Sequence, residues 1–169
     1  MMKTCKENTS LANLFGLPYV VLRTPIAMDQ STLNFNWQVG GTAAFSVYTN
    51  ATESIDEASA ELGVSAVLRF LSRMGIIKYK CHGGYMGTII DEDDMMNVTC
   101  GAAGIYRSLH KSGDEVEKGD ILAQIIHPYE GNVISEVKAP ADGILFFAHE
   151  SPLVMENTIV FKMIKRLHK

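Results

Sequence analysis

Histidines are the residues of this chain with the clearest capacity for metal chemistry. The chain has five of them, at positions His82, His110, His127, His149 and His168. A catalytic zinc site takes about three protein ligands and keeps one position open for water. No two of these histidines have the spacing that places a pair of ligands on one helical face. The sequence therefore predicts no metal ligands on this chain alone, and each histidine is expected to be a surface or hydrogen-bonded residue.

The cysteines offer a second kind of chemistry. Cys81 and His82 are adjacent, and a nucleophilic thiol would need a base, here His82 or His110, together with a third orienting group. This pattern gives the hypothesis of a self-sufficient hydrolase, although no signature of a triad supports it. Cys5 and Cys100 complete an odd set of distant cysteines, which is typical of reduced thiols in a cytoplasmic protein.

Composition excludes two classes of partner. The formal net charge is −4 and the isoelectric point is near 5.7, whereas binding to nucleic acid needs clustered positive charge. The only basic cluster is the tail at 162–169, which is expected to be solvated. Hydrophobic residues at 47% and charged residues at 20% are ordinary for a globular protein. No apolar run approaches the length of about 18 residues that indicates a membrane span, so neither nucleic acid nor a membrane is expected.

The first part of the chain shows alternating helix and strand signals. In order, we predict a helix at 3–15, a strand at 19–22, a polar loop at 23–38, a strand at 45–48 and a helix at 54–74. Capping-box patterns at 4–7 and 54–57 begin the two helices, and Gly75 ends the second. This order suits one flank of an α/β sheet that is covered by helices. We therefore expect a first domain at 1–75 and a linker at 76–95, with one short strand at 88–90.

The second part shows turn signals at short, regular spacing. Gly-Asp occurs at 113–114 and again at 119–120, and a third turn at 139–143 precedes another apolar run. Gly allows the positive φ of tight turns, and Asp hydrogen-bonds the backbone two residues on. These signals predict a small, closed β-sandwich or barrel over 96–169. Its strands are expected near 98–107, 121–126, 133–138, 143–148 and 158–164.

The order Gly-Asp-x-Val-x-x-Gly-Asp-x-Leu-Ala, followed by Val-x-Ala-Pro-x-Asp-Gly-Ile, resembles the barrel-sandwich hybrid of biotinyl and lipoyl carriers. Such carriers present a modified Lys at the tip of the central hairpin. The tip at 128–132 has no Lys, so a carrier role is rejected.

The same order is also similar to the C-terminal domain of the succinylglutamate desuccinylase/aspartoacylase family, which are zinc-dependent deacylases of the carboxypeptidase superfamily. The passage 41–50 with the helix 54–74 resembles the end of that family's catalytic domain, and Ala12-x-x-Phe15-Gly16-x-Pro18 resembles the turn ahead of it. The resemblance implies an α+β chain. A partial, zinc-peptidase-like α/β sheet with helices would be followed by a barrel-sandwich-hybrid domain.

The family's catalytic residues carry over poorly to this chain. Its zinc-binding His-x-x-Glu and further His lie upstream of anything in this sequence, so zinc is implied by the family but not expected here. Tyr48 takes the position of the family's catalytic Glu, which acts as general base on zinc-bound water. A phenol with a pKa of about 10 cannot take that role at neutral pH without a large shift. Glu53, five residues on, is the alternative carboxylate, although we expect it to bind the start of the next helix.

These observations favour a chain that corresponds to the C-terminal part of a zinc-dependent N-acyl-amino-acid deacylase and is not catalytic by itself. Apolar strands at 19–22 and 45–48 are expected at or near an open sheet edge, which invites pairing. We therefore predict a homo-oligomer or a complex with a separately encoded zinc-binding N-terminal half. The alternative is a non-enzymatic binding or assembly module built on the barrel-sandwich domain.

Overall fold

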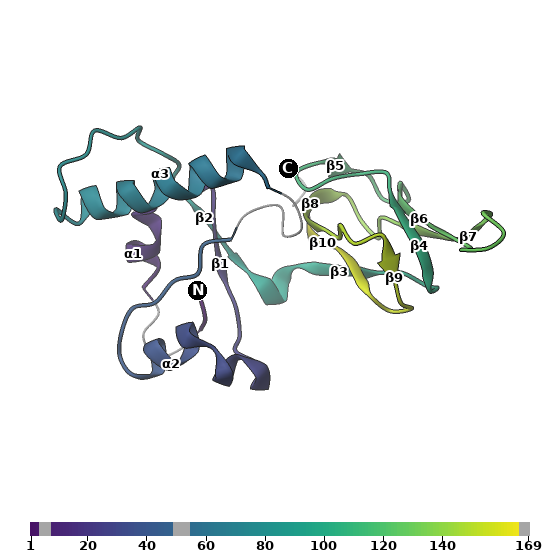
Figure 1. The fold of residues 1–169 in the computed structure, drawn as a ribbon, viewed down its shortest axis with the longest axis horizontal. Helices are drawn as coiled ribbons and strands as arrows, with labels where there is room; N and C mark the ends of the chain where they lie inside the picture. Colours follow the sequence, from purple (N-terminus) through teal and green to yellow (C-terminus); the bar gives the residue numbers. More distant parts are fainter. Residues whose placement is uncertain (4–7, 49–54, 166–169) are drawn as a thin grey trace. The chain divides into compact units, whose positions relative to one another are not determined.

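The structure, a computed structural model, describes residues 1–3, 8–48 and 55–165 (Figure 1). The chain forms two compact units, Met1–Asp93 and Asp94–Lys169. The elements of the first unit are α1 (Thr9–Asn13), β1 (Tyr19–Leu22), the 3-10 helix η1 (Ala27–Ser31), α2 (Leu33–Val39), α3 (Glu57–Arg73) and β2 (Thr88–Asp91). A second 3-10 helix, η2 (Glu92–Asp94), follows β2 directly.

The first unit is built around a small parallel sheet. β1 pairs with β2 in parallel, so that Tyr19 lies beside Thr88 and Leu22 beside Asp91. On the other side of β1, the N–H of Lys3 donates to the carbonyl of Arg23 at 2.7 Å, in a parallel bridge. β1 is therefore covered on both sides at its carboxyl end, whereas β2 pairs only with β1 among the described strands. In this two-stranded sheet β2 has an open edge among the described strands, and the outer edge of β1 is bridged only at the carboxyl end of the strand.

Local capping explains where the helices begin and end. The Asn8 side chain accepts the N–H of Leu11 at 2.8 Å and starts α1, while the Asp56 side chain accepts the N–H of Ser59 and starts α3. α3 stops before Gly75, whose φ of 73° suits the left-handed end of a helix. Phe70 of α3 stacks on Phe15, with ring centroids 4.3 Å apart. This contact places α3 beside α1 near the amino ends of the strands, whereas α2 lies near the carboxyl end of β1 (Figure 1).

Several predictions for the first unit were wrong. The expected loop at 23–38 contains η1 and α2, which Thr32 caps by accepting the N–H of Phe35 at 3.3 Å. The expected strand at 45–48 is not formed: residues 42–48 belong to no helix or strand. The first helix begins at Thr9 and not at residue 3, since Lys3 pairs with β1. The predicted capping box at 4–7 lies outside the described residues, as does Ser54 of the one at 54–57, and the residue that caps α3 is Asp56.

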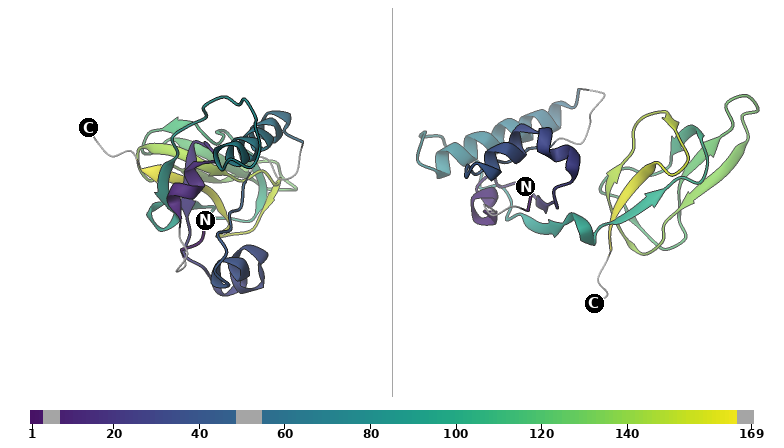
Figure 2. Two further views of the ribbon diagram at one scale, coloured as in Figure 1. Left: turned by 90° about the vertical axis from the view of Figure 1, so that its left-hand side faces the viewer. Right: turned by 90° about the horizontal axis from the view of Figure 1, so that it is seen from below.

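The second unit consists of two antiparallel sheets. Its strands are β3 (Met96–Thr99), β4 (Gly104–Ser108), β5 (Glu115–Val116), β6 (Ile121–Ile126), β7 (Val133–Lys138), β8 (Gly143–Ala148), β9 (Leu153–Val154) and β10 (Ile159–Lys165). One sheet has the order β3-β10-β8-β5 and the other the order β7-β6-β4-β9. Buried side chains from both sheets, including Leu122, Leu145 and Phe161, form one continuous core. The two sheets thus lie face to face, as the right-hand view of Figure 2 shows.

The turn signals located these strands well. β6, β7 and β8 have the bounds that the sequence predicted, and β10 differs by one residue at each end. The strand expected at 98–107 is in fact two, β3 and β4, which belong to different sheets. No described strand pairing joins the two sheets into one closed barrel. The coarse description, helices followed by antiparallel sheets, is confirmed, whereas the barrel-sandwich detail is not.

Candidate functional site

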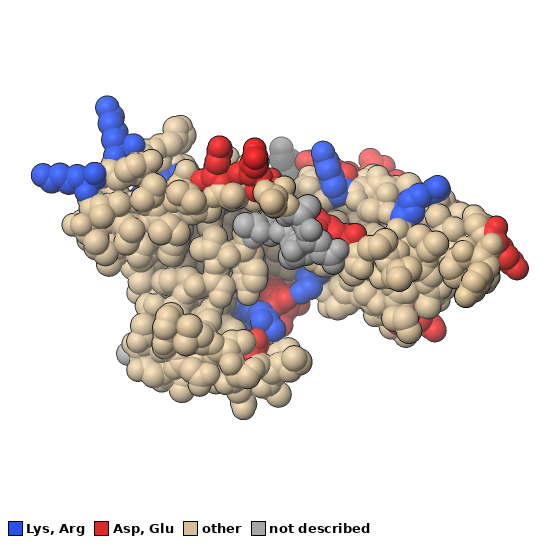
Figure 3. Space-filling model, in the orientation of Figure 1, with Lys and Arg blue, Asp and Glu red and all other residues tan. Residues whose placement is uncertain are grey.

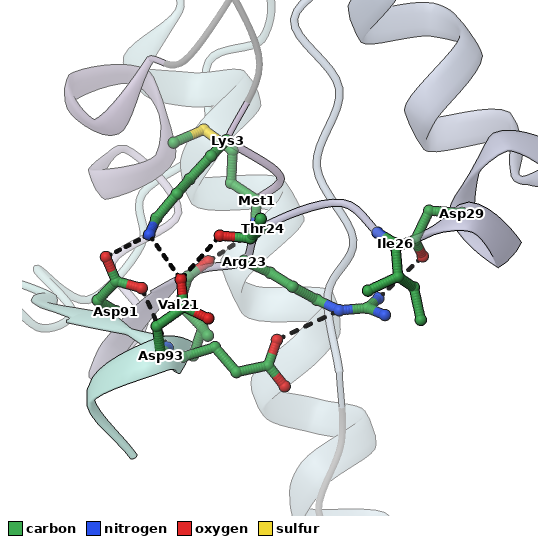
Figure 4. A network of polar contacts seen from close by, with 10 residues as sticks. Met1, Lys3, Val21, Arg23, Thr24, Ile26, Asp29, Asp91 and Asp93 are labelled. Atoms are coloured by element: carbon green, nitrogen blue, oxygen red, sulfur yellow. Dashed lines mark hydrogen bonds and ion pairs between the residues drawn. The ribbon is translucent and has the colours of Figure 1, made fainter.

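Charged side chains gather where the two parallel strands end. In α/β sheets, ligands bind outside the carboxyl ends of parallel strands. Arg23 follows β1, and the acidic run 91–93 ends and follows β2, so the register of the strands brings these residues together. Figure 4 shows the resulting network of hydrogen bonds and ion pairs. We call this group the carboxyl-end cluster: Lys3, Arg23, Thr24, Asp29, Asp91, Glu92 and Asp93.

Arg23 is held between two carboxylates of the carboxyl-end cluster. Its Nη1 donates to Oδ1 of Asp29 at 3.0 Å, and its Nε lies 3.2 Å from Oε2 of Glu92. Asp29 is buried, and its Oδ2 accepts the N–H of Ile26 at 2.7 Å. Charge-assisted bonds of this kind are stronger than neutral ones. The start of η1 is therefore fastened to the end of β1.

Lys3 joins the other carboxylates of the carboxyl-end cluster. Its Nζ lies 2.5 Å from Oδ2 of Asp91 and 3.2 Å from Oδ2 of Asp93, which also accepts the hydroxyl of Thr24 at 2.8 Å. The hydrogen bond from Thr24, followed by the one from Lys3, lowers the pKa of Asp93. The hydrogen bond to Asp91 raises the pKa of Lys3. Both charges are thus stabilised by their neighbours at neutral pH.

The chemistry of the carboxyl-end cluster is that of a structural network. A general base needs a pKa near the working pH and an accessible lone pair. Here Asp29, Asp91, Glu92 and Asp93 are all engaged by cations of the same network. The cluster contains no imidazole and no thiol. Its residues hold the strand ends together, and none of them is placed as a proton shuttle.

The predicted site residues do not form a catalytic arrangement within the part of the chain that the structure describes. Tyr48 is 81% exposed and lies in the irregular segment that follows α2. In the same segment, the carbonyl of Ala44 accepts Nε2 of the buried Gln38 at 3.1 Å. Glu53 lies outside the described residues. The role of position 48 therefore stays a prediction.

The histidines have roles in local structure. Nδ1 of His127 accepts the N–H groups of Tyr129 and Glu130, which shapes the tip of the β6–β7 hairpin. His149 packs edge-on against Tyr106, with ring centroids 5.4 Å apart. Nδ1 of His110 lies 3.4 Å from a carboxylate oxygen of Asp114, four residues further along the chain. His168 lies outside the described residues.

The described residues form neither the predicted cysteine nucleophile with its base nor a set of metal donors. Among the described residues, no hydrogen bond joins the thiol of Cys81 to an imidazole, whereas the carbonyl of His82 accepts Nε of Arg69 at 2.9 Å. Within residues 1–3, 8–48 and 55–165, no group of three or more His, Cys, Asp or Glu side chains could hold a metal ion. The zinc that the family resemblance implies thus does not fit the donors that this part of the chain presents.

Sequence reasoning missed the carboxyl-end cluster as a unit. The acidic run 91–94 falls within the linker predicted at 76–95, and Asp29 falls within the polar loop predicted at 23–38. The available signal was the position of charged residues directly after two apolar strands. Pairing those strands in parallel, with the register observed, would have brought Arg23 and Glu92 together.

Comparison with known proteins gives similarity in structure alone. No family model matches the sequence, and no curated protein matches it. A succinylglutamate desuccinylase/aspartoacylase structure from Rhodobacter sphaeroides superposes with a TM-score of 0.74 at 19% sequence identity. The match covers 100% of this chain and 53% of the Rhodobacter chain. The ectoine utilization protein EutE (DoeB) from Ruegeria pomeroyi gives 0.73 at 18% identity, over 98% and 53%. An aspartoacylase family protein from Mesorhizobium loti gives 0.65 at 18% identity, over 95% and 48%.

These matches confirm the resemblance that the motifs predicted, at the level of the fold. The chain spans about half the length of the structures it matches. That share is consistent with a C-terminal part.

Proposed function

We propose that this chain is the C-terminal part of a deacylase-like hydrolase and acts only with a separate zinc-binding N-terminal half. The observation that carries the proposal is the extent of the structural match, which includes all of this chain but about half of the matched chain. Zinc hydrolases use a metal ion to activate water or polarise a carbonyl. The described residues do not offer the donors for such an ion, so a partner would have to supply them.

The exposed apolar surface of the first unit favours the binding of a partner. Large apolar side chains of η1 and α2 are exposed, among them Met28, Leu33 and Trp37 at 79%, 62% and 52%. Few charged side chains lie over α2 on the face shown in Figure 3. Exposed apolar patches of this kind mark interaction sites. β2 adds a sheet edge that pairs only with β1 among the described strands, with Ile89 exposed on it.

A binding or assembly module without catalysis is the second candidate. Tyr48 favours it, because the motif resemblance assigns this residue to the position of the family's catalytic carboxylate and its phenol is largely exposed. None of the described helices is long and apolar enough to span a bilayer. The two candidates differ in whether an N-terminal half is required.

The test is the zinc content of the purified chain, alone and after incubation with a candidate N-terminal half. We expect zinc and deacylase activity only in the mixture. Near-stoichiometric zinc on the chain alone would show that its own side chains form a site. No complex and no zinc in either sample would favour the binding module.

A matched pair of variants locates the contact. Leu33→Asp introduces a charge into the exposed face of α2, and we expect it to weaken the complex at least tenfold, because a charge would be buried. Leu153→Asp changes the same residue type at similar exposure in the second unit, 66% against 62%. Equal effects of the two variants would contradict docking through α2.

A further inference from the structure

A small pocket lies at the opposite end of the parallel sheet from the carboxyl-end cluster. It has a volume of about 170 Å³ and is lined by Asn13, Arg73 and the loop 83–87. Asn13 is the last residue of α1, ahead of β1, and Gly87 directly precedes β2. Because the two strands are parallel, both contributions meet at the amino ends of the strands. The pocket is thus separate from the site described above.

The pocket contains a positive charge without a described counter-ion. Nη1 of Arg73 donates to the carbonyls of Asn13 and Leu14 at 3.3 and 3.0 Å, and Nη2 donates to the carbonyl of Gly83 at 2.5 Å. A guanidinium has five N–H donors, so Nε–H and one N–H of Nη2 have no acceptor among the described residues. No carboxylate of the described residues lies within ion-pair distance of Arg73.

Arg69, one turn earlier on α3, adds a second charge of the same kind. It is buried and donates to the carbonyls of His82 and Phe15 at 2.9 and 2.6 Å. Again, no described carboxylate pairs with it. The partial negative charge at the end of α3 offsets part of this charge. It does not replace an anion, because carbonyl dipoles fall short of a full opposite charge.

The loop 83–87 supplies backbone donors beside these charges. The N–H of Tyr85 donates to the carbonyl of Gly16 at 2.9 Å. The N–H groups of Gly83, Gly84, Met86 and Gly87 have no acceptor among the described residues. Gly84 has a φ of +70°, and a Cβ at this position would lie 2.8 Å from the guanidinium of Arg69. Successive amides around a left-handed residue form the concave geometry that binds anions.

Asn13 completes the lining. Its Oδ1 is buried and has no described hydrogen-bond partner. Rotation of the side-chain amide by 180° exchanges Oδ1 for Nδ2, which is a donor. The Asn13 amide therefore offers unused hydrogen-bonding capacity beside Gly87, where a Cβ would lie 2.8 Å from Oδ1 of Asn13.

We propose that this pocket binds a small oxyanion, namely the carboxylate or phosphate group of a small molecule. The free edge of the Arg73 fork and the amides of the loop would hold the oxygens, since guanidinium recognises both groups bidentately. Tyr85 and Met86 are 59% and 98% exposed and leave room for an apolar remainder of the ligand. The proposal does not depend on the proposed deacylase role.

The decisive test is a titration of the full chain followed by amide NMR. Phosphate and acetate are added in separate experiments, with sodium chloride at matched ionic strength as the control. We expect saturable shifts of the four unpaired loop amides and of the Arg73 Nε–H with phosphate, acetate or both, and the stronger ligand identifies the preferred oxyanion. Shifts that rise in proportion to ionic strength and are equal with chloride would overturn the proposal, as would no shift at all.

Two variants test whether the guanidinium of Arg73 binds the oxyanion. Arg73→Gln is expected to weaken binding at least tenfold, whereas Arg107→Gln, an exposed arginine of the second unit, leaves it unchanged. The melting temperature without ligand shows whether Arg73→Gln still folds, because its carbonyl contacts are also lost. If it does not fold, the titration of the unaltered chain decides the question. Equal affinity in a folded Arg73→Gln variant would refute the role of this guanidinium.

Discussion

The two units of this chain are stabilised in different ways. The second unit has a continuous apolar core with members from every strand, and several side chains are fully buried. The first unit buries few large apolar side chains, and most of the exposed ones in the described chain belong to it. Its elements are joined instead by arginines, with Arg23 and Arg69 each binding parts of the chain that are distant in sequence. We therefore expect the second unit to be the more stable of the two, and the proposed partner would cover the exposed apolar side chains of the first.

The largest effect is expected in the core of the second unit. Phe161→Ala removes a fully buried ring, and we expect it to lower the free energy of unfolding by about 3–5 kcal/mol, since the loss combines transfer and cavity costs. Phe147→Ala is the matched control, because Phe147 is 42% exposed. Chemical denaturation followed by circular dichroism measures both. Similar losses would mean that the core is not the main source of stability.

Loss of the Arg69 contacts is expected to be the next largest effect. Arg69→Met keeps much of the apolar stem but leaves the carbonyls of Phe15 and His82 without a donor. We expect the first unit to lose about 3 kcal/mol, from unsatisfied buried groups. The fluorescence of Trp37, the only tryptophan, reports on this unit during denaturation. An unchanged midpoint would show that α1 and α3 are held by their aromatic contact alone.

We expect the proposed partner to stabilise the first unit and not the second. A ligand that binds the folded form at a hundredfold excess over its dissociation constant stabilises it by about 2.7 kcal/mol. We expect an N-terminal half to raise the unfolding transition reported by Trp37 and to leave that of the second unit in place. Differential scanning calorimetry with fluorescence separates the two transitions. A single shared transition would show that the two units do not unfold independently.

The smallest effect concerns pH. The hydroxyl of Ser59 donates to Oδ2 of Asp56 at 2.5 Å, and this bond, followed by the one from the Ser59 N–H, lowers the pKa of Asp56. A lowered pKa gives stability that is present above the ordinary aspartate value and is lost as the pH falls through the folded value. Asp56→Asn, which also caps a helix, should flatten the acid side of the first unit's stability profile. An identical acid limb in both proteins would contradict this.

Sequence predicted the second unit better than the first for a physical reason. Its strands are joined by tight turns whose chemistry is local, such as the one at Gly119, which has a φ of 97°. α2 escaped prediction because its apolar residues Leu33 and Trp37 face outward and its buried residue is Gln38. Residues 45–48 are apolar enough for a strand, yet no neighbouring strand among the described residues pairs with them.

The candidate site was harder to predict than the fold. The roles of Arg23 and Glu92 depend on a register between β1 and β2 that no local pattern encodes. The pocket at Arg73 likewise depends on hydrogen bonds from α3 to α1 and to the loop 83–87. Motif resemblance indicated the relation to known folds. It assigned only Tyr48 and Glu53 as site residues, and both assignments stay predictions.

The pairing of β1 with β2 also has a consequence for biosynthesis. Tyr19 lies beside Thr88, so β1 leaves the ribosome long before its neighbour has been translated. Contacts between distant segments form slowly, because loop closure must precede them. The hairpin β6–β7 can form as soon as it emerges. The nascent chain therefore exposes the apolar strand β1 until β2 has also emerged, and this interval is when a chaperone would bind it.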